Sequence, residues 1–547
     1  MASTRRVINI LALTLLGLVL IVVGIVCIII FWPSDFTWLG IGGVNERHVW
    51  TRYESDEIAA ALEHRNLIIH SRHTDVEVRV RKHGQHDTQG VMHERGSITI
   101  FENARGLSFN NIHRTQIVLT QVLMDGGEVY HKIRIVAPTG IVTRNARVIL
   151  NLVDADEQNH PPYNFILDTG IGRVDFRADQ VVENMNIDNI TVLPGSVGPI
   201  TMPAVPTAAF PFRVSLNRLT VQSNIANVHV PQNVREEVKI TSPSGSVTVG
   251  SVGVEGFLDA IVDVPGSTSI NVTIGSVFGD VLFNSTLGSL RITGQAHGVL
   301  GGIVMQTSTA SLTATRIGAQ LDFVSRVSST VSIGTTMGVV DATFYGAGSM
   351  AITHSFSIVE IQSRAAGLTV GGTGATQGAR GPVTINNRYG ATRVNFARDA
   401  FLSSALTFTG FDGNINATRI IGLTNITIQI GGRAQVFASF AEVNGTNNIT
   451  FVGSAQPGTT FGNVTVTLLT RPIAQGGPFD GFILRVHGTA RARDHTNWEN
   501  ILGGGNAQIG VEIHNYSNGG DWPVRNGGPG ILNVTTSNSF WLRAAAG

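Results

Sequence analysis

Apolar and polar residues alternate in short runs through the middle of the chain, and these runs recur every 18 to 23 positions between residues 240 and 466. Each run is bounded by Gly, Ser, Thr or Asn. Alternation with a period of two is typical of a strand that buries one face. The residues that open successive runs are Val247, Ile270, Leu290, Leu312, Val331, Met350 and Leu368.

A second apolar run lies about halfway through most of these periods. The second runs cover residues 281–283, 303–305, 321–323, 339–344 and 358–361. Repetition at this spacing is typical of a solenoid, in which each coil adds short strands to long parallel sheets and buries its apolar side chains against its neighbours. We therefore predict an all-β protein whose residues 166–470 form a parallel β-solenoid, or β-helix, with about 18–23 residues per coil.

The segments on either side of the repeats have other patterns. Residues 66–165 hold longer alternating runs, such as residues 76–81, and predict a β-rich N-terminal cap, formed either by a β-sandwich or by the irregular first coils of the solenoid. Residues 194–211 are rich in Pro and small residues and predict a projecting loop. Residues 471–547 are rich in Gly and contain three Trp, so we predict a C-terminal cap that covers the last coil.

The N-terminus carries a long apolar segment. Residues 7–32 contain no charged side chain, and as a helix they would extend roughly 39 Å, which is enough to cross a bilayer. Arg5 and Arg6 precede the segment, whereas no basic residue follows it before Arg47. This charge bias predicts a single-pass signal anchor in the lipid bilayer, with residues 1–6 cytosolic, residues 33–65 as a linker and the C-terminus extracellular or lumenal. The protein is expected at the cell surface or in a secretory-pathway membrane.

Ten Asn-x-Ser/Thr sequons follow the predicted anchor. In an Asn- and Thr-rich β protein several such sequences are expected by chance, but their number favours N-linked glycans on an ectodomain. The ten are Asn189, Asn271, Asn284, Asn416, Asn425, Asn444, Asn448, Asn463, Asn515 and Asn533.

Composition limits the partners further. The formal net charge is zero, so nothing in the overall charge favours a nucleic acid partner. The chain has a single cysteine, Cys27, which lies in the predicted anchor, so no intramolecular disulfide can form. Stability must come from the stacking of coils.

Two short patterns suggest chemistry but are better explained as structure. Asp168 lies in FILDTG, which resembles the active-site turn of pepsin-like aspartic proteases, yet no second Asp-Thr/Ser-Gly is present. A strand that ends in a turn explains Asp168 well enough. His83, His86 and Asp87 lie in a predicted loop and are weak candidates for metal ligands, although solvated turn residues are the favoured interpretation.

Enzymes that act on polysaccharides also use parallel β-helices, and they need several carboxylates on adjacent coils. The acidic residues between positions 240 and 480 look isolated, apart from Asp259 and Asp280, which are 21 positions apart and could stack. We therefore predict no catalytic residue and no cofactor, and a glycan-binding or glycan-cleaving β-helix is the alternative.

The order of these features resembles the putative-adhesin-like β-solenoid families, whose domains have no assigned function. The resemblance covers residues 66–466 and rests on the segments LIIHSRHTDVEVRV, KIRIVAPTG, GSVTVGSVGVEGFL and GSLRITGQAHGVL. It implies surface display with adhesion or assembly, and it brings no catalytic residue with it.

Together these patterns predict a non-enzymatic, membrane-anchored extracellular glycoprotein that acts as a structural or adhesive surface element. Flat, charge-poor coil faces are natural contact surfaces, so a homo-oligomer that extends into a filament or coat is expected. Adhesion to other surface proteins is a further hypothesis.

Overall fold

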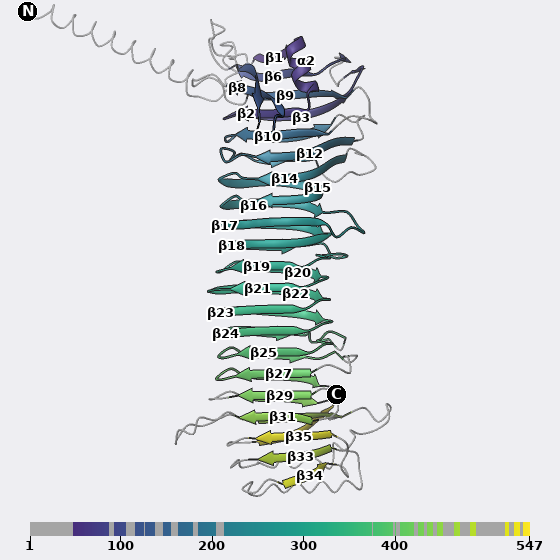
Figure 1. Cartoon of the computed structure of the whole chain (residues 1–547), viewed down its shortest axis with the longest axis vertical. Coiled ribbons are helices and arrows are strands. Elements are labelled where there is room, and N and C mark those ends of the chain that lie inside the picture. Colours follow the sequence, from purple (N-terminus) through teal and green to yellow (C-terminus); the bar gives the residue numbers. More distant parts are fainter. Residues whose placement is uncertain are drawn as a thin grey trace, which may run out of the picture.

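In this computed structural model the chain is a rod of stacked β-strands, with β1 near one end and β34 at the other (Figure 1). The predicted all-β parallel β-solenoid is confirmed. The structure describes residues 47–86, 92–104, 115–124, 126–136, 146–154, 162–178, 184–203, 213–374, 376–397, 400, 405–420, 425–430, 435–440, 446–451, 464–470, 482–487, 520–524, 530–535 and 540–546.

Each coil places one strand segment on each of two sides of the rod, which we call side A and side B. Some long strands bend at a corner and contribute to both sides. Side A stacks, in order, β8 (Val129–Val136), β2 (Asn66–Ser71), β10 (Tyr163–Thr169), β12 (Asn184–Val192), β14 (Arg213–Val221), the end of β15 (Ile225–Ile240), the starts of β17 (Ala260–Val277) and β18 (Gly279–Ile292), β19 (Ile303–Thr307), β21 (Leu321–Ser325), the starts of β23 (Val340–Ser355) and β24 (Val359–Val370), β25 (Val383–Asn387), β27 (Ala405–Gly410), β29 (Asn425–Ile430), β31 (Thr446–Phe451), β35 (Gly530–Thr535) and β33 (Phe482–His487).

Side B runs alongside it, and neighbouring segments on both sides pair in parallel. Its segments are β9 (Arg147–Asp154), β3 (Asp75–Lys82), β11 (Val174–Ala178), β13 (Ile200–Thr201), the start of β15, β16 (Ser244–Val252), the ends of β17 and β18, β20 (Ser311–Ile317), β22 (Ser328–Thr336), the ends of β23 and β24, β26 (Thr392–Asn395), β28 (Ile415–Ile420), β30 (Val436–Phe440), β32 (Val464–Thr470) and β36 (Phe540–Ala546).

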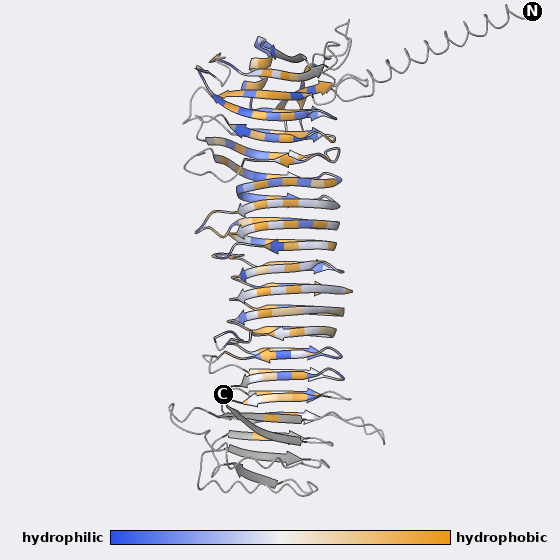
Figure 2. Cartoon of the chain, turned by 180° about the vertical axis from the view of Figure 1, so that it is seen from behind, coloured by the Kyte–Doolittle hydropathy of each residue, from blue (hydrophilic) through white to orange (hydrophobic). Residues whose placement is uncertain are grey.

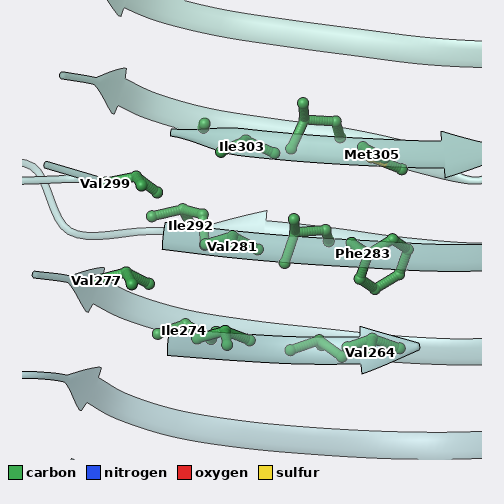
Figure 3. Close-up of a cluster of buried hydrophobic side chains, with 14 of the residues drawn as sticks. Val264, Ile274, Val277, Val281, Phe283, Ile292, Val299, Ile303 and Met305 are labelled. Atoms are coloured by element: carbon green, nitrogen blue, oxygen red, sulfur yellow. The ribbon is translucent and has the colours of Figure 1, made fainter. Parts of the chain in front are cut away.

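The core consists of apolar side chains stacked one coil above the next. On side A, Val264, Phe283 and Met305 occupy the same position in three successive coils (Figure 3). Hydrophobic and hydrophilic residues alternate along the strands, so each strand buries one set of side chains and exposes the other (Figure 2). Two further buried residues, Val277 and Val299, pair at the corner between the sides.

The predicted repeat needs one correction. On side B the buried ladder is Val247, Val272, Leu290, Leu312, Val331, Met350 and Leu368. Ile270, which was predicted at the second position, instead pairs with Gly245 and Gly288. A shift of two residues keeps the same face buried, so alternation alone could not exclude it.

Antiparallel strands cover both sides at one end of the stack and side A at the other end. At one end β6 (Ser97–Ala104) pairs with β9, β1 (Arg47–Tyr53) pairs with β6, and β7 (Gln116–Leu123) pairs with β8. Helix α2 (Asp56–Glu63) buries Ile58 and Leu62 there. At the other end β34 (Gly520–Val524) pairs with β33. A small separate hairpin joins β4 (Gln85–His86) to β5 (Met92–His93).

Strands β2 and β3 fall within the segment 66–165 that was predicted as a cap. They pair in parallel with β10 and β11, so they form a full coil of the solenoid. Among the residues that the structure describes, no helix is long and apolar enough to cross a membrane. The predicted anchor at residues 7–32 lies outside them and stays a prediction.

We expect the stability of the stack to depend on glycines at corners where successive coils lie too close for a Cβ atom. A Cβ on Gly275 would lie 1.8 Å from the carbonyl oxygen of Gly250 in the preceding coil, whereas a Cβ on Gly266, in the same strand, meets nothing within 4 Å. Gly275→Ala should therefore destabilise the protein by about 1–3 kcal/mol, measured by urea unfolding. Gly266→Ala is the matched control, and equal unfolding midpoints for the two variants would contradict this packing.

Candidate functional surface

Three acidic residues form a column on the outside of side A. Asp322 pairs in register with Asp341, and Asp341 pairs with Glu360. Adjacent carboxylates therefore come from neighbouring strands about 4.8 Å apart. The column ends at Val304 on one side and Thr384 on the other. We call these three residues the acidic column.

One column on the outside of side B consists of small uncharged residues, whereas Arg291 and Arg393 lie in a neighbouring column. From β16 to β23 one column reads Ser246, Asn271, Ser289, Ser311, Thr330 and Ser349. Hydroxyl groups link successive coils here, since Ser289 Oγ donates to Asn271 Oδ1 at 2.8 Å. Side B is therefore a flat polar face, whereas side A concentrates negative charge in one place.

A third surface lies at the corner where the chain leaves side A. Tyr345 follows Phe344, which pairs with Ser325 and Ser363 of the adjacent coils, so Tyr345 lies between Arg326 and Arg364. The next coils place Arg388 and Phe411 in line with them. We call this set the corner ridge: Arg326, Tyr345, Arg364, Arg388, Tyr389 and Phe411.

The corner ridge is exposed and aromatic. The exposed fractions are 63% for Tyr345, 41% for Tyr389 and 42% for Phe411. The rings of Tyr389 and Phe411 meet edge to face at 6.4 Å, and Arg388 Cζ lies 5.1 Å from the Tyr389 ring centroid. Aromatic and Arg side chains are enriched at protein interfaces, so this ridge has the composition of a contact surface.

The acidic residues singled out from the sequence do not stack. Asp280 pairs with Ile261, so Asp259 lies two positions out of register with it. The coil from Ile261 to Asp280 is 19 residues long, so a separation of 21 positions failed to bring the two together. Asp280 instead accepts a hydrogen bond from the Gly302 amide at 2.7 Å.

Asp168 of FILDTG has a structural partner. It lies on β10 in register with His70 of β2, and its Oδ2 is 2.6 Å from His70 Nδ1. The pair joins two neighbouring coils across side A. On side B, the buried carboxylate of Glu77 forms ion pairs with Arg79 and Arg147.

The candidate metal ligands are only partly described. His83 lies in the turn before β4 and His86 on β4, and both are exposed. Asp87 lies outside the described residues. Within the described part of the chain, no group of three or more His, Cys, Asp and Glu side chains is arranged to hold a metal ion.

The sequons fall mainly on the outside of the coils where they are described. Asn271 and Asn284 are exposed, and Asn189, Asn416 and Asn448 are half-buried. Asn425 and Asn533 lie in β29 and β35. The other three, Asn444, Asn463 and Asn515, lie outside the described residues.

No protein-family model and no curated protein matches the chain. Among solved structures, the chain is similar to the crystal structure of a protein described as a putative adhesin from Parabacteroides merdae ATCC 43184. The match has 8% identity and a TM-score of 0.21, and it covers 68% of this chain and 97% of that one. The resemblance to putative adhesins predicted from the sequence thus has a counterpart among solved structures, but a TM-score this low carries no argument about function.

One titrating group is half-buried near the N-terminal end of the rod. His131 on β8 packs against His64 with ring centroids 4.5 Å apart, and its Nε2 is buried without a hydrogen-bond partner among the described residues. Burial lowers the pKa of His131 from its ordinary value of 6.5, and the charge of His64 lowers it further. The folded state therefore resists protonation of His131.

This lowered pKa predicts acid sensitivity. Between the folded pKa and 6.5 the unfolded chain binds the proton more readily, so the contribution of His131 to stability is complete above that window and is lost as pH falls through it. We expect His131→Phe to lose less stability than the unchanged protein when the pH is lowered from about 7.5 to about 5, measured by urea unfolding. The exposed His83→Gln variant is the control and should behave like the parent; an identical pH profile for His131→Phe would refute the assignment.

Proposed function

We propose that the protein is a non-enzymatic, membrane-anchored surface element whose rigid solenoid self-associates into an extended assembly. At about 4.8 Å per strand, the stack on side A from β8 to β33 is roughly 80 Å long. Every strand in it is hydrogen-bonded to its neighbours, so the rod is stiff along its length. Such a rod suits a spacer or a building block better than a hinge-bending enzyme.

The anchor and the glycans belong to this proposal. Residues 7–32 hold the chain in a cell-surface or secretory-pathway membrane, and the sequons carry N-linked glycans on the outer side. The uncharged length of the anchor and the arginines that precede it support this orientation.

Charge complementarity between two surfaces of the rod carries the proposal of self-association. The corner ridge presents three arginines, none of which forms an ion pair with a described residue, and the acidic column presents three carboxylates. Arg364 and Arg388 lie on neighbouring strands, as Asp341 and Glu360 do, whereas Arg326 is two strands from Arg364. The ridge of one copy can therefore lie along the acidic column of a second copy with Arg364 and Arg388 opposite Asp341 and Glu360.

The symmetry of this contact determines the kind of assembly that forms. The ridge and the column are different surfaces of one chain, so their contact is heterologous and leaves a free ridge and a free column on the outer copies. A contact of this kind extends into a filament or coat unless the rotation between copies closes a ring. The aromatic rings of the ridge add apolar area that salt does not screen.

Charge reversal tests the contact. We expect Arg364→Glu with Arg388→Glu, and separately Asp341→Lys with Glu360→Lys, to weaken self-association by about tenfold or more because like charges then face each other. Sedimentation of the full chain in detergent measures the association. The variant that carries all four changes should recover it, and failure of this recovery with normal folding would exclude the ridge and the column as partners.

The anchor requires its own measurement. Expressed in eukaryotic cells, the full chain should remain with membranes after carbonate extraction, and removal of N-linked glycans should increase its mobility in a denaturing gel. Replacing three apolar residues of the anchor with Asp should abolish membrane retention, since each charge in the bilayer centre costs about 2.5–3.5 kcal/mol. A full chain that is extracted by carbonate and unaffected by the glycosidase would contradict the proposed location.

A further inference from the structure

Side A carries exposed aliphatic residues in line with the acidic column. Leu282 and Val304 are each 38% exposed, and they precede Asp322 in the same column of outward side chains. Two exposed threonines continue the column beyond Glu360. In the order of the coils, this set, which we call the side A column, reads Leu282, Val304, Asp322, Asp341, Glu360, Thr384 and Thr407. The column is therefore apolar toward the N-terminal coils, acidic in the middle and uncharged beyond.

The corner ridge also changes character along the rod. Val327 follows Arg326 directly and is 56% exposed, so it extends the ridge on the N-terminal side. One exposed residue from each of five successive coils then reads Val327, Tyr345, Arg364, Arg388 and Phe411. The neighbours of the two arginines thus differ between the N-terminal and the C-terminal direction.

Two alignments of the ridge on the side A column of a second copy keep both ion pairs. When the rods are parallel, Arg364 faces Asp341, and Arg388, one strand farther, faces Glu360. When the rods are antiparallel, the two arginines exchange their carboxylates. The ion pairs alone do not distinguish the alignments, so the residues next to them decide the orientation.

The parallel alignment matches these neighbouring residues. Tyr345 then faces Asp322, and the tyrosine hydroxyl can donate a hydrogen bond to the carboxylate. One coil nearer the N-terminus, Val327 faces Val304, so two exposed apolar side chains leave water together. Arg326 lies beside Val327, one strand from Asp322, and adds a positive charge there.

The antiparallel alignment leaves mismatches. Phe411 then faces Asp322, and a phenyl ring offers no hydrogen-bond donor to a carboxylate that loses water. Val327 faces Thr407 instead of an aliphatic residue, and Val304 gains no apolar partner from the ridge. The unpaired carboxylate disfavours this orientation.

We propose that copies of the chain associate as parallel rods with a stagger of one coil, with Val327 of one copy on Val304 of the next. The inference rests on the proposed self-association, to which it adds the orientation and the register of the copies. The stagger arises because Arg364 shares a coil with Glu360 but faces Asp341, one strand of about 4.8 Å nearer the N-terminus. Each added copy is displaced in the same direction, so parallel rods build an open filament or coat rather than a closed ring. Parallel copies also have their N-terminal ends on one side, as anchors in a shared membrane require.

Cross-linking of single-cysteine chains tests the orientation. Cys27→Ser removes the one cysteine of the chain. In this background the full chain with Val327→Cys is mixed in detergent with a chain of different tag length that carries either Val304→Cys or Thr407→Cys. Mild oxidation should link the Val327→Cys chain to the Val304→Cys chain and not to the Thr407→Cys chain, because a disulfide needs Cα atoms about 4.4–6.8 Å apart. Sedimentation of the same mixtures before oxidation reports whether the chains assemble.

A matched pair of substitutions tests the apolar contact. Val327→Asp should weaken self-association by about tenfold or more, because the new carboxylate lies against Val304 and beside Asp322. Val254→Asp makes the same change at a valine that is 41% exposed in the loop at the other corner, and it should leave the association unchanged. Urea unfolding midpoints of both variants separate a lost contact from misfolding.

The outcomes separate this inference from the self-association on which it rests. A link between the Val327→Cys and Thr407→Cys chains, in mixtures that still sediment as an assembly, would establish antiparallel rods and overturn the inference alone. Assembly without either link, or equal association of Val327→Asp and Val254→Asp, would exclude this register. Chains that do not assemble before oxidation would exclude the self-association and the inference together.

Discussion

Hydrogen bonding between successive coils, with apolar side chains stacked in register, is the interaction on which the rest of the structure depends. No coil can bury its own apolar face, because the neighbouring coils supply the contacts, as Val264, Phe283 and Met305 illustrate. The spacing of about 4.8 Å between strands is therefore a strict constraint. It explains why Gly250 and Gly275 stack at a corner, where a Cβ has no room.

The same register governs the outer surface. Residues one coil apart come together even though they are about 20 positions apart in the sequence, so a single column of side chains acts as a unit. The acidic column gathers its carboxylates this way, and Arg316, Thr335 and His354 line up in the same way at the end of side B. A rod of this kind needs no loops to build a site, because its coils repeat a side chain at fixed intervals.

The sequence predicted the fold well because its main signal is the alternation that the fold requires. Six of the seven predicted ladder positions on side B are correct, and Ile270 failed because alternation cannot distinguish a shift of two residues. The outer surface was harder to predict. Asp322, Asp341 and Glu360 are each 19 positions apart, which is the local coil length, yet they were interpreted as isolated.

The errors have a common physical cause. Columns can be predicted only when the length of each coil is known, and a loop such as residues 253–259 changes that length without disturbing the buried pattern. Asp259 and Asp280 were expected to stack at a separation of 21 positions, but the coil between them is 19 residues long, so they are out of register. The corner ridge was missed for a related reason, since Tyr345 and Phe411 follow the ends of the alternating runs, where no periodic signal remains.

The capped ends restrict how such rods can associate. Strands β6 and β7 at one end pair antiparallel with the stack, and β34 does so on side A at the other end, which hinders a second rod from continuing the parallel ladder of side A along the axis. Contacts through the sides and corners are therefore favoured. Self-association through the corner ridge and acidic column occupies one corner and side A, and it leaves side B and the opposite corner uncovered. An assembled filament or coat would therefore present these two surfaces many times along its length.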